Sequence, residues 1–587
     1  MTSSGGHRED EGSGRLRRSL LLMLPAVTAL GLTGALRLLN SRFPRPDECW
    51  FLQVLHRVSS GEVLYRDIFY GVSPLTVYVT LPFIRLFGTE LLVLKGLSFL
   101  CCILMVLCLY WVARELGIRP RLCRVIPLAW LAVARPFGEH FFSYNQFVSL
   151  IVILGLGVTA HWLRSERCKD RFAYASLVGV GIVAGLCFCT KQNVGLYILA
   201  AVSFVILVHR VGNLEPSRPP LWSLMLYFWM TFAVTTGLVL LPVWRNGGME
   251  MFLEYGFLAK GIYLRLGQIP YWDGLQRLEL WYLLPPTGLG LLLLTWLFEA
   301  RGARVRTVAV LVFVGVAFLT VFPRAGPGHL GQAQAASLLG LAYALERLAL
   351  PRLGRRADLV CDLMAIGVIL SAAVVIHPIR LMAPTYLFLA LAYVMSSRWA
   401  SNWPRPARLA LVPLFLAALT FWGASFYRQV GRVYGDYSAV TTISHYRGLP
   451  HQKRTRDHLQ TNLSCLHNQV VSGESMLILS PIASFYYLAG DIRNPTSSDY
   501  PLSTTFGRRG EEAIVTALKQ GEIDLVYYDE PGLNHVSPAL HPARLIRYVT
   551  ESMVPHSQCG GGTIYRQPLR ESSGLPIPYA GSQYGKQ

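Results

Sequence analysis

The apolar stretch LVLKGLSFLCCILMVLCLYWVARE, residues 92–115, is long enough to cross a membrane as a single helix. A helix needs about 20 apolar residues to span the hydrocarbon core of a bilayer. A window of that length identifies about thirteen such stretches, which together predict an α-helical polytopic membrane protein. The predicted spans are 19–39, 92–115, 123–135, 145–163, 172–190, 194–209, 221–243, 281–299, 306–322, 329–349, 358–376, 379–396 and 408–425.

Composition supports the membrane prediction. The 587 residues are 52% hydrophobic and only 15% charged, whereas soluble proteins have roughly a quarter of charged residues. The net charge of +20 comes largely from short Arg clusters between apolar stretches. The positive-inside rule and anionic lipid headgroups account for such clusters, so we do not expect nucleic-acid binding.

The basic residues also predict the orientation. Arg15, Arg17 and Arg18 precede the first span, which places the N-terminus in the cytoplasm. Every second loop is then basic as well: 114–124, 164–171, 209–218, 301–306, 352–356 and 398–408. The first span is interpreted as an anchor rather than a cleaved signal, because no small-x-small cleavage site follows it.

An odd number of spans leaves the C-terminal part outside the cell membrane. The predicted division is a basic cytoplasmic tail (1–18), a membrane domain (19–425) with a first outer loop (40–91), an extracytoplasmic α/β domain (426–569) and a disordered tail (570–587). Within the α/β domain, residues 476–479, 523–528 and 562–565 are expected as strands and residues 511–519 as a helix. Cys465 and Cys559 are the only cysteines there, and whether they form a disulfide stays open.

Glycine-rich spacing has a structural explanation here. Gly179, Gly181 and Gly185 form a GxGxxxG pattern inside a predicted span. Close packing of two helices explains glycines at that depth better than a nucleotide-binding loop.

Polar residues collect at the outer ends of the predicted helices. They are Asp47 and Glu48, Arg66 and Asp67, Arg135 with Glu139 and His140, Lys191 with Gln192 and Asn193, Arg324 and His329, and His377 with Arg380. The positive-inside rule leaves an outer face poor in Lys and Arg, so cations gathered there require another partner. An anionic ligand such as a lipid phosphate is the simplest candidate.

Three of these positions carry the sharpest chemical predictions. The adjacent carboxylates Asp47 and Glu48 repel each other, so they are expected to serve chemistry, a cation or a polar ligand. Lys191 lies in a predicted turn of about four polar residues, where its ammonium must meet a carboxylate, a phosphate or water. Snorkelling to the interface is the alternative for Lys191.

The other outer segments are less specific. Pro and Gly residues between 322 and 330 break a helix and present Arg324 and His329 to the outer face, unless the segment is a plain loop. For Arg135, Glu139 and His140, a functional site and a solvated loop are equally favoured interpretations. For His377 and Arg380 an ordinary hairpin is the preferred interpretation.

An ordered set of short motifs carries a family resemblance. The motifs are Asp47-Glu48, Gly61-x-x-x-Tyr65-Arg66-Asp67, Gly71-x-x-Pro74-Leu75, Leu86-Phe87-Gly88, Gly185-Leu186-x-x-x-x-Lys191-Gln192, Phe322-Pro323-Arg324 with His329, Phe485 to Gly490, and Asn494-Pro495-Thr496. Together they resemble the GT-C glycosyltransferases that use polyprenyl-phosphate sugars. The likeness is to the branch of protein mannosyltransferases, the aminoarabinose transferase of lipid A and rhizobial galacturonosyltransferases, and it spans nearly the whole chain.

This resemblance implies an inverting transfer of one sugar from an undecaprenyl- or decaprenyl-phosphate carrier to a lipid, glycan or protein acceptor. The reaction is expected at the outer face of the cytoplasmic (inner) membrane. By resemblance, Asp47 acts as general base with Glu48 assisting, or the two help to hold a divalent metal (Mg²⁺ or Mn²⁺); no cofactor is certain. The remaining predicted substrate-binding residues are Tyr65, Arg66 and Asp67 for the sugar, Lys191, Arg324 and His329 for the phosphate, and His140 and Gln192.

Two further expectations complete the prediction. The segment from Pro74 to Gly88 is apolar but too short to cross, so it is expected to lie along the membrane interface as an amphipathic helix. A transporter or flippase for a lipid-linked or anionic solute is the main alternative function, and it predicts inverted repeats and polar residues at the bilayer midplane. Neither is apparent in the sequence. Intact acidic residues also argue against a scaffold protein with a decayed site.

Overall fold

The computed structural model describes most of the chain, in two compact units. The described residues are 24–36, 38–39, 44–133, 141–167, 173–211, 220–258, 269–276, 280–300, 303–322, 325–375, 382–396, 404–435, 437–439, 443–471, 474–506 and 510–568. The first unit is Met1–Asp457 and the second is His458–Gln587. The predicted terminal tails lie mostly or wholly outside the described residues.

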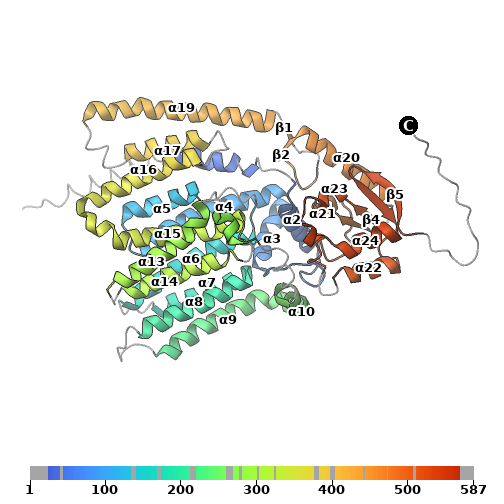
Figure 1. Cartoon of the computed structure of the whole chain (residues 1–587), viewed down its shortest axis with the longest axis horizontal. Helices are drawn as coiled ribbons and strands as arrows, with labels where there is room; N and C mark the ends of the chain where they lie inside the picture. The colour runs from blue at the N-terminus through green and yellow to red at the C-terminus, as the bar shows by residue number, and fades with distance from the viewer. Residues whose placement is uncertain are drawn as a thin grey trace, which may run out of the picture. The chain divides into compact units, whose positions relative to one another are not determined.

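The first unit is a bundle of helices, shown from blue to orange in Figure 1. Its elements are a helix at 24–36, α2 (Pro46–Ser59), α3 (Leu75–Phe87), α4 (Leu91–Glu115), α5 (Pro120–Val133), α6 (Tyr144–Arg167), α7 (Ala173–Thr190), α8 (Gln192–Val211), α9 (Leu221–Arg245), α10 (Met249–Leu253), the π-helix η2 (Glu254–Leu258), α12 (Tyr271–Gln276), α13 (Leu280–Phe298), α14 (Arg304–Leu319), α15 (Pro327–Leu348), the 3₁₀ helix η3 (Leu350–Arg356), α16 (Ala357–Val375), α17 (Met382–Ser396), α19 (Arg405–Gly435), and the paired strands β1 (Tyr437–Ala439) and β2 (Pro450–Gln452).

The helices are apolar enough to make this a multi-pass membrane protein. Among the described residues, five helices have the length and composition to cross a bilayer: Leu91–Glu115, Tyr144–Ser165, Gln192–Val211, Leu221–Arg245 and Leu409–Arg432. Helical structure lies within each of the other predicted spans too, in shorter pieces. The count of thirteen crossings therefore stays a prediction.

Glycine allows two of these helices to approach closely. A Cβ atom on Gly181 would lie 2.7 Å from Cβ of Thr231 and 2.9 Å from the carbonyl oxygen of Phe228, both on α9. A Cβ atom on Gly185 would lie 2.8 Å from Cβ of Thr235 on the same helix. The predicted role of these glycines in helix packing is confirmed, because any side chain would push α7 away from α9.

Ion pairs at one end of the bundle join loops that are far apart in sequence. Arg119, before α5, lies 2.9 Å from Glu346 at the end of α15, and Arg121 lies 3.0 Å from Asp358 at the start of α16. The loops 114–124 and 352–356, both predicted to be cytoplasmic, therefore meet at the same end. At the other end α2 and α3 pack against α4 (Figure 1).

The second unit is built around a four-stranded sheet with strand order β3-β4-β6-β5. The strands are β3 (Met476–Leu479), β4 (Leu525–Tyr528), β6 (Gly562–Arg566) and β5 (Val554–Cys559), and only the β3–β4 pair is parallel. The helices are α20 (Lys453–Gln469), which begins before the unit boundary, α21 (Ala483–Ala489), α22 (Gly510–Gln520), α23 (Glu530–Leu533) and α24 (Ala543–Ser552). Apolar side chains of β3, β4, α22 and α24 form its core.

Two features of the C-terminal part differ from the sequence prediction or complete it. The helix α19 continues to Gly435, past the predicted end at residue 425, because Phe426 and Val430 still pack on Leu36. The second compact unit begins at His458, and the bounds 426–569 of the extracytoplasmic domain stay a prediction. Within it Cys465 and Cys559 form a disulfide with their Cα atoms 5.7 Å apart.

Candidate functional site

The two adjacent carboxylates at the start of α2 occupy different environments. Asp47 is exposed to solvent, whereas Glu48 is completely buried. A carboxylate oxygen of Glu48 lies 3.6 Å from Nζ of Lys95, which is itself buried and donates a hydrogen bond of 3.0 Å to the carbonyl oxygen of Leu38. Successive helical residues point about 100° apart, so one carboxylate faces the bundle and the other faces outward. Of the two, only Asp47 is accessible to a substrate.

Burial has a strong effect on Glu48. It raises the pKa of this carboxyl group from 4.5 to about 7, although Lys95 and Arg45 act in the opposite direction. Lys95 was not predicted as the partner of Glu48, because it lies in an otherwise apolar span. The position of Lys95 in the first turns of a helix that follows an acidic loop was the one sequence signal for this ion pair.

Tyr65, Arg66 and Asp67 form a turn in the first outer loop. Tyr65 is fully buried with a positive φ of 72°, and its hydroxyl group donates a 2.6 Å hydrogen bond to the carbonyl oxygen of Val72. The side chain of Arg66 is 54% exposed and donates two 2.9 Å hydrogen bonds to Asp67. Asp67 also accepts a hydrogen bond of 2.8 Å from the backbone of Val63, and the arginine lowers its pKa. These contacts fix the shape of the loop.

Lys191 lies at a one-residue break between α7 and α8. This break is shorter than the predicted four-residue turn, because Gln192 and Asn193 already belong to α8. Nζ of Lys191 donates hydrogen bonds to Oδ1 of Asn145 (3.1 Å) on α6 and to Oε1 of Gln332 (3.2 Å) on α15. The ammonium group also lies 5.8 Å from the ring centroid of Tyr144.

The same glutamine connects Lys191 to a second predicted site residue. Nε2 of Gln332 lies 3.2 Å from Nδ1 of His329, in the first turn of α15. The structure thus brings together Lys191 and His329, which are far apart in the chain. Asn145 and Gln332, which complete this corner, were not predicted, because nothing in a helix sequence marks a neutral amide as the partner of a distant lysine.

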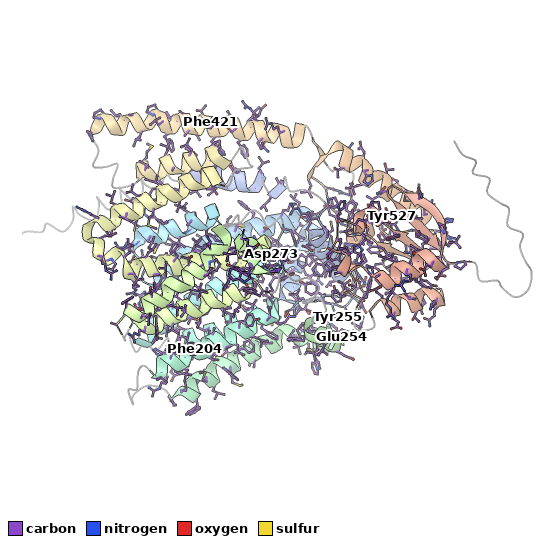
Figure 2. All side chains as sticks on the ribbon, in the orientation of Figure 1. Phe204, Glu254, Tyr255, Asp273, Phe421 and Tyr527 are labelled. Atoms are coloured by element: carbon purple, nitrogen blue, oxygen red, sulfur yellow. A yellow bond between two sulfur atoms is a disulfide. The ribbon has the colours of Figure 1, made fainter. Side chains whose placement is uncertain are left out.

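Gln192 joins three segments of the first unit. Its amide nitrogen donates hydrogen bonds to the carbonyl oxygens of Gly256 in η2 (2.8 Å) and Gly71 in the first outer loop (3.5 Å). Its amide oxygen accepts a hydrogen bond of 3.3 Å from Ser73. Beside this junction, the ring of Tyr255, labelled in Figure 2, lies 4.8 Å from that of Phe69. Gln192 is 2% exposed, so it holds the loop in place rather than facing a ligand.

Aromatic residues connect the acidic start of α2 to the lysine corner. Trp50 follows Asp47 by about one helical turn and stacks on Tyr70, with ring centroids 5.5 Å apart. Tyr70 is next in sequence to Gly71, which accepts the hydrogen bond from Gln192. Burial raises the pKa of Tyr70 well above its ordinary value, and Tyr144 beside Lys191 adds to the effect. Both parts of the candidate site therefore belong to one end of the first unit.

Some predicted residues lie outside the described part of the chain. They are His140, Arg324, Arg135, Glu139, His377 and Arg380.

The carboxylates at the start of α2 do not fit a divalent metal site. Mg²⁺ or Mn²⁺ prefers several oxygen ligands, but Glu48 turns inward to Lys95 while Asp47 turns outward. Within the described ranges no three His, Cys, Asp or Glu residues are grouped closely enough to hold a metal ion.

Comparison with solved structures identifies the fold. No family model matches the chain, and no curated protein matches it by sequence. The crystal structure of ArnT from Cupriavidus metallidurans bound to undecaprenyl phosphate is 16% identical over 93% of this chain and 97% of that chain, with a TM-score of 0.51.

Two other structures are also similar. The apo form of the same ArnT is 14% identical over the same shares, with a TM-score of 0.50. The oligosaccharyltransferase AglB from Archaeoglobus fulgidus is 11% identical over 94% of this chain and 75% of its own, with a TM-score of 0.47. The likeness to ArnT extends over nearly all of both chains, so this protein shares the fold of ArnT, a mostly helical bundle as predicted.

Proposed function

We propose that this protein is a membrane glycosyltransferase that moves a sugar from a polyprenyl-phosphate carrier to an acceptor hydroxyl group, with inversion at the anomeric carbon. The observation that carries the proposal is the meeting of Lys191 with His329, through Gln332, in a unit of ArnT-like fold. A cation and a histidine at helix ends suit a phosphate group. The ArnT structure with undecaprenyl phosphate bound supports a lipid phosphate as the donor.

Asp47 is the proposed general base. Its exposed carboxylate accepts the proton of the acceptor hydroxyl group as that oxygen attacks the anomeric carbon. The bond between the anomeric carbon and the phosphate oxygen breaks, and the polyprenyl phosphate leaves with the bonding electrons. Lys191 and His329 stabilise the negative charge that develops on the leaving phosphate, together with Arg324 as a proposed third group.

Glu48 has a different role in this proposal. Because it is buried against Lys95, it does not contact an acceptor. It acts as a positioning residue that anchors α2 to α4, and thereby fixes the direction in which Asp47 points. Tyr65, Arg66 and Asp67 shape the loop that carries the sugar pocket.

One observation supports an extracytoplasmic location of the second unit, and another supports a site next to the membrane interface. The disulfide between Cys465 and Cys559 is typical of an oxidising compartment, which favours an outer location for the second unit. The helix α3 exposes Leu86 (75%) and Phe87 (67%), as expected for a helix that dips into the membrane interface. A donor held by a lipid tail would reach the site from that interface.

The proposal is tested with membranes that contain the protein and a panel of radiolabelled undecaprenyl-phosphate sugars. We expect the wild-type protein to transfer at least one sugar and Asp47→Asn to abolish transfer without loss of expression or folding. Asp358→Asn is a matched control, since it also removes a half-exposed carboxylate but at the opposite end of the bundle. If Asp47→Asn retains the wild-type rate, Asp47 is not the base; if no sugar of the panel is transferred, the proposed activity is wrong.

A further inference from the structure

Two hydrogen-bond donors in the first unit are buried without an acceptor. Nε1 of Trp50 and the hydroxyl group of Tyr70 have no hydrogen-bond partner among the described residues. The two rings stack, with an interplanar angle of 23° and centroids 5.5 Å apart. Tyr70 is fully buried, while Trp50 is partly exposed. The partly exposed indole ring of Trp50 therefore stacks on a fully buried phenol ring, and the donor atoms of both rings are buried.

Unpaired donors side by side require an explanation. Buried polar groups in folded proteins nearly always have a partner, and a donor without one costs roughly 1–3 kcal/mol. Stacking alone requires neither the N–H nor the O–H group, because aromatic rings without donors also stack. The two donors thus indicate acceptor atoms beyond the described residues, which a bound ligand can supply.

The location of the pair indicates which ligand supplies those atoms. Trp50 lies three residues after Asp47 on α2, so the two side chains project from the same face of the helix. Tyr70 precedes Gly71, whose carbonyl oxygen accepts a hydrogen bond from Gln192, the residue after Lys191. The pair is therefore connected on one side to the proposed base and on the other to the proposed phosphate-binding corner.

In a donor lipid, the group between the attacked carbon and the phosphate is the sugar. A pyranose carries several hydroxyl oxygens that accept hydrogen bonds and an apolar face of C–H groups that packs against aromatic rings. We propose that Trp50 and Tyr70 form the sugar subsite, in which the indole N–H and the phenol O–H donate to hydroxyl oxygens of the transferred sugar. This subsite rests on the proposed glycosyltransferase function.

The experiment removes each donor and keeps an aromatic ring at each position. Trp50→Phe and Tyr70→Phe are compared with the wild type in transfer from the labelled undecaprenyl-phosphate sugar that the wild type uses. In parallel, binding of undecaprenyl phosphate without a sugar is measured by the ligand-induced shift in melting temperature. Trp162→Phe is the matched control, because Nε1 of Trp162 is also buried without a partner in the described chain, but beside His209 on α8, away from the site.

The subsite predicts a specific pattern. Each of the two variants should lose about tenfold in kcat/KM for the sugar donor, as expected for one lost hydrogen bond of about 1.4 kcal/mol. Binding of undecaprenyl phosphate should stay unchanged, and the melting temperature without ligand should stay the same or rise. The Trp162→Phe variant should match the wild type in kcat/KM and in the shift that undecaprenyl phosphate causes, although its smaller buried ring should lower the melting temperature itself.

Other results overturn the inference. Wild-type transfer by both variants would show that the two donors do not contact the sugar. An equal loss of undecaprenyl phosphate binding and of transfer would show that the pair serves the phosphate or the fold. A wild-type protein that neither binds undecaprenyl phosphate nor transfers sugar would refute the proposed function itself, and the subsite with it.

Discussion

The buried Glu48–Lys95 pair predicts an unusual dependence of stability on pH. A carboxyl group with an ordinary pKa of 4.5 that is raised to about 7 in the folded protein binds its proton more tightly when folded. Stability therefore falls as pH rises from about 4.5 to about 7, and it is constant above that window. The total fall is roughly 3 kcal/mol, because each pKa unit corresponds to about 1.4 kcal/mol.

Replacement of Glu48 by Gln tests this reasoning. The amide keeps the shape of the side chain but does not titrate, so the fall between pH 5 and pH 8 should disappear. We would measure the free energy of unfolding by SDS titration in dodecylmaltoside micelles at both pH values. The expected result is that Glu48→Gln gains roughly 3 kcal/mol relative to the wild type on going from pH 5 to pH 8.

Two further variants make the test specific. Asp47→Asn removes the adjacent exposed carboxylate, whose effect on the pKa of Glu48 is the smallest among its neighbours, and should change the pH dependence much less than Glu48→Gln. Lys95→Met removes the cation 3.6 Å away and should widen the pH range over which stability falls. The reasoning would be refuted if Glu48→Gln lost stability relative to the wild type on going from pH 5 to pH 8. That result would mean that the ion pair stabilises the folded wild-type protein by more than the burial of its charges costs.

Three other outcomes are expected. Lys191→Ala should raise the KM for the lipid donor several-fold and leave the KM for the acceptor unchanged; an effect on the acceptor alone would contradict the phosphate role. Cys465→Ser should destabilise the second unit by about 2–5 kcal/mol in a melting experiment, because it removes the disulfide with Cys559. A reducing agent should cause the same loss of stability in the wild-type protein, and no effect of either change would contradict the disulfide. Arg66→Ala should slow transfer but change the free energy of unfolding by less than about 1 kcal/mol, because its ion pair with Asp67 is exposed; a stability loss with normal transfer would make Arg66 purely structural.

Much of the fold follows from local patterns in the sequence. Each apolar span found by hydropathy contains helical structure among the described residues, and the short apolar runs at 476–479 and 523–528 predicted the strands β3 and β4. The edge strand β5 was missed because its sequence, VPHSQC, is polar and contains Pro555, which only an edge position tolerates.

The site was less predictable because its contacts are remote in sequence. Lys191 was identifiable as a cation at a helix break, but its partners Asn145 and Gln332 are 46 and 141 residues away. The opposite directions of Asp47 and Glu48 depend on where α2 packs against α4, which no local pattern encodes. Two adjacent acidic residues therefore look equivalent in the sequence and differ completely in the folded protein.

The junction at Gln192 limits how this protein can be recombined with relatives. One amide group there connects α8 to the backbone of the first outer loop and to the π-helix η2. A chimera that receives only the loop from another enzyme would break both hydrogen bonds unless the graft also carried η2 and the start of α8. Attempts to change acceptor preference by loop exchange should therefore move these three segments together as one cassette.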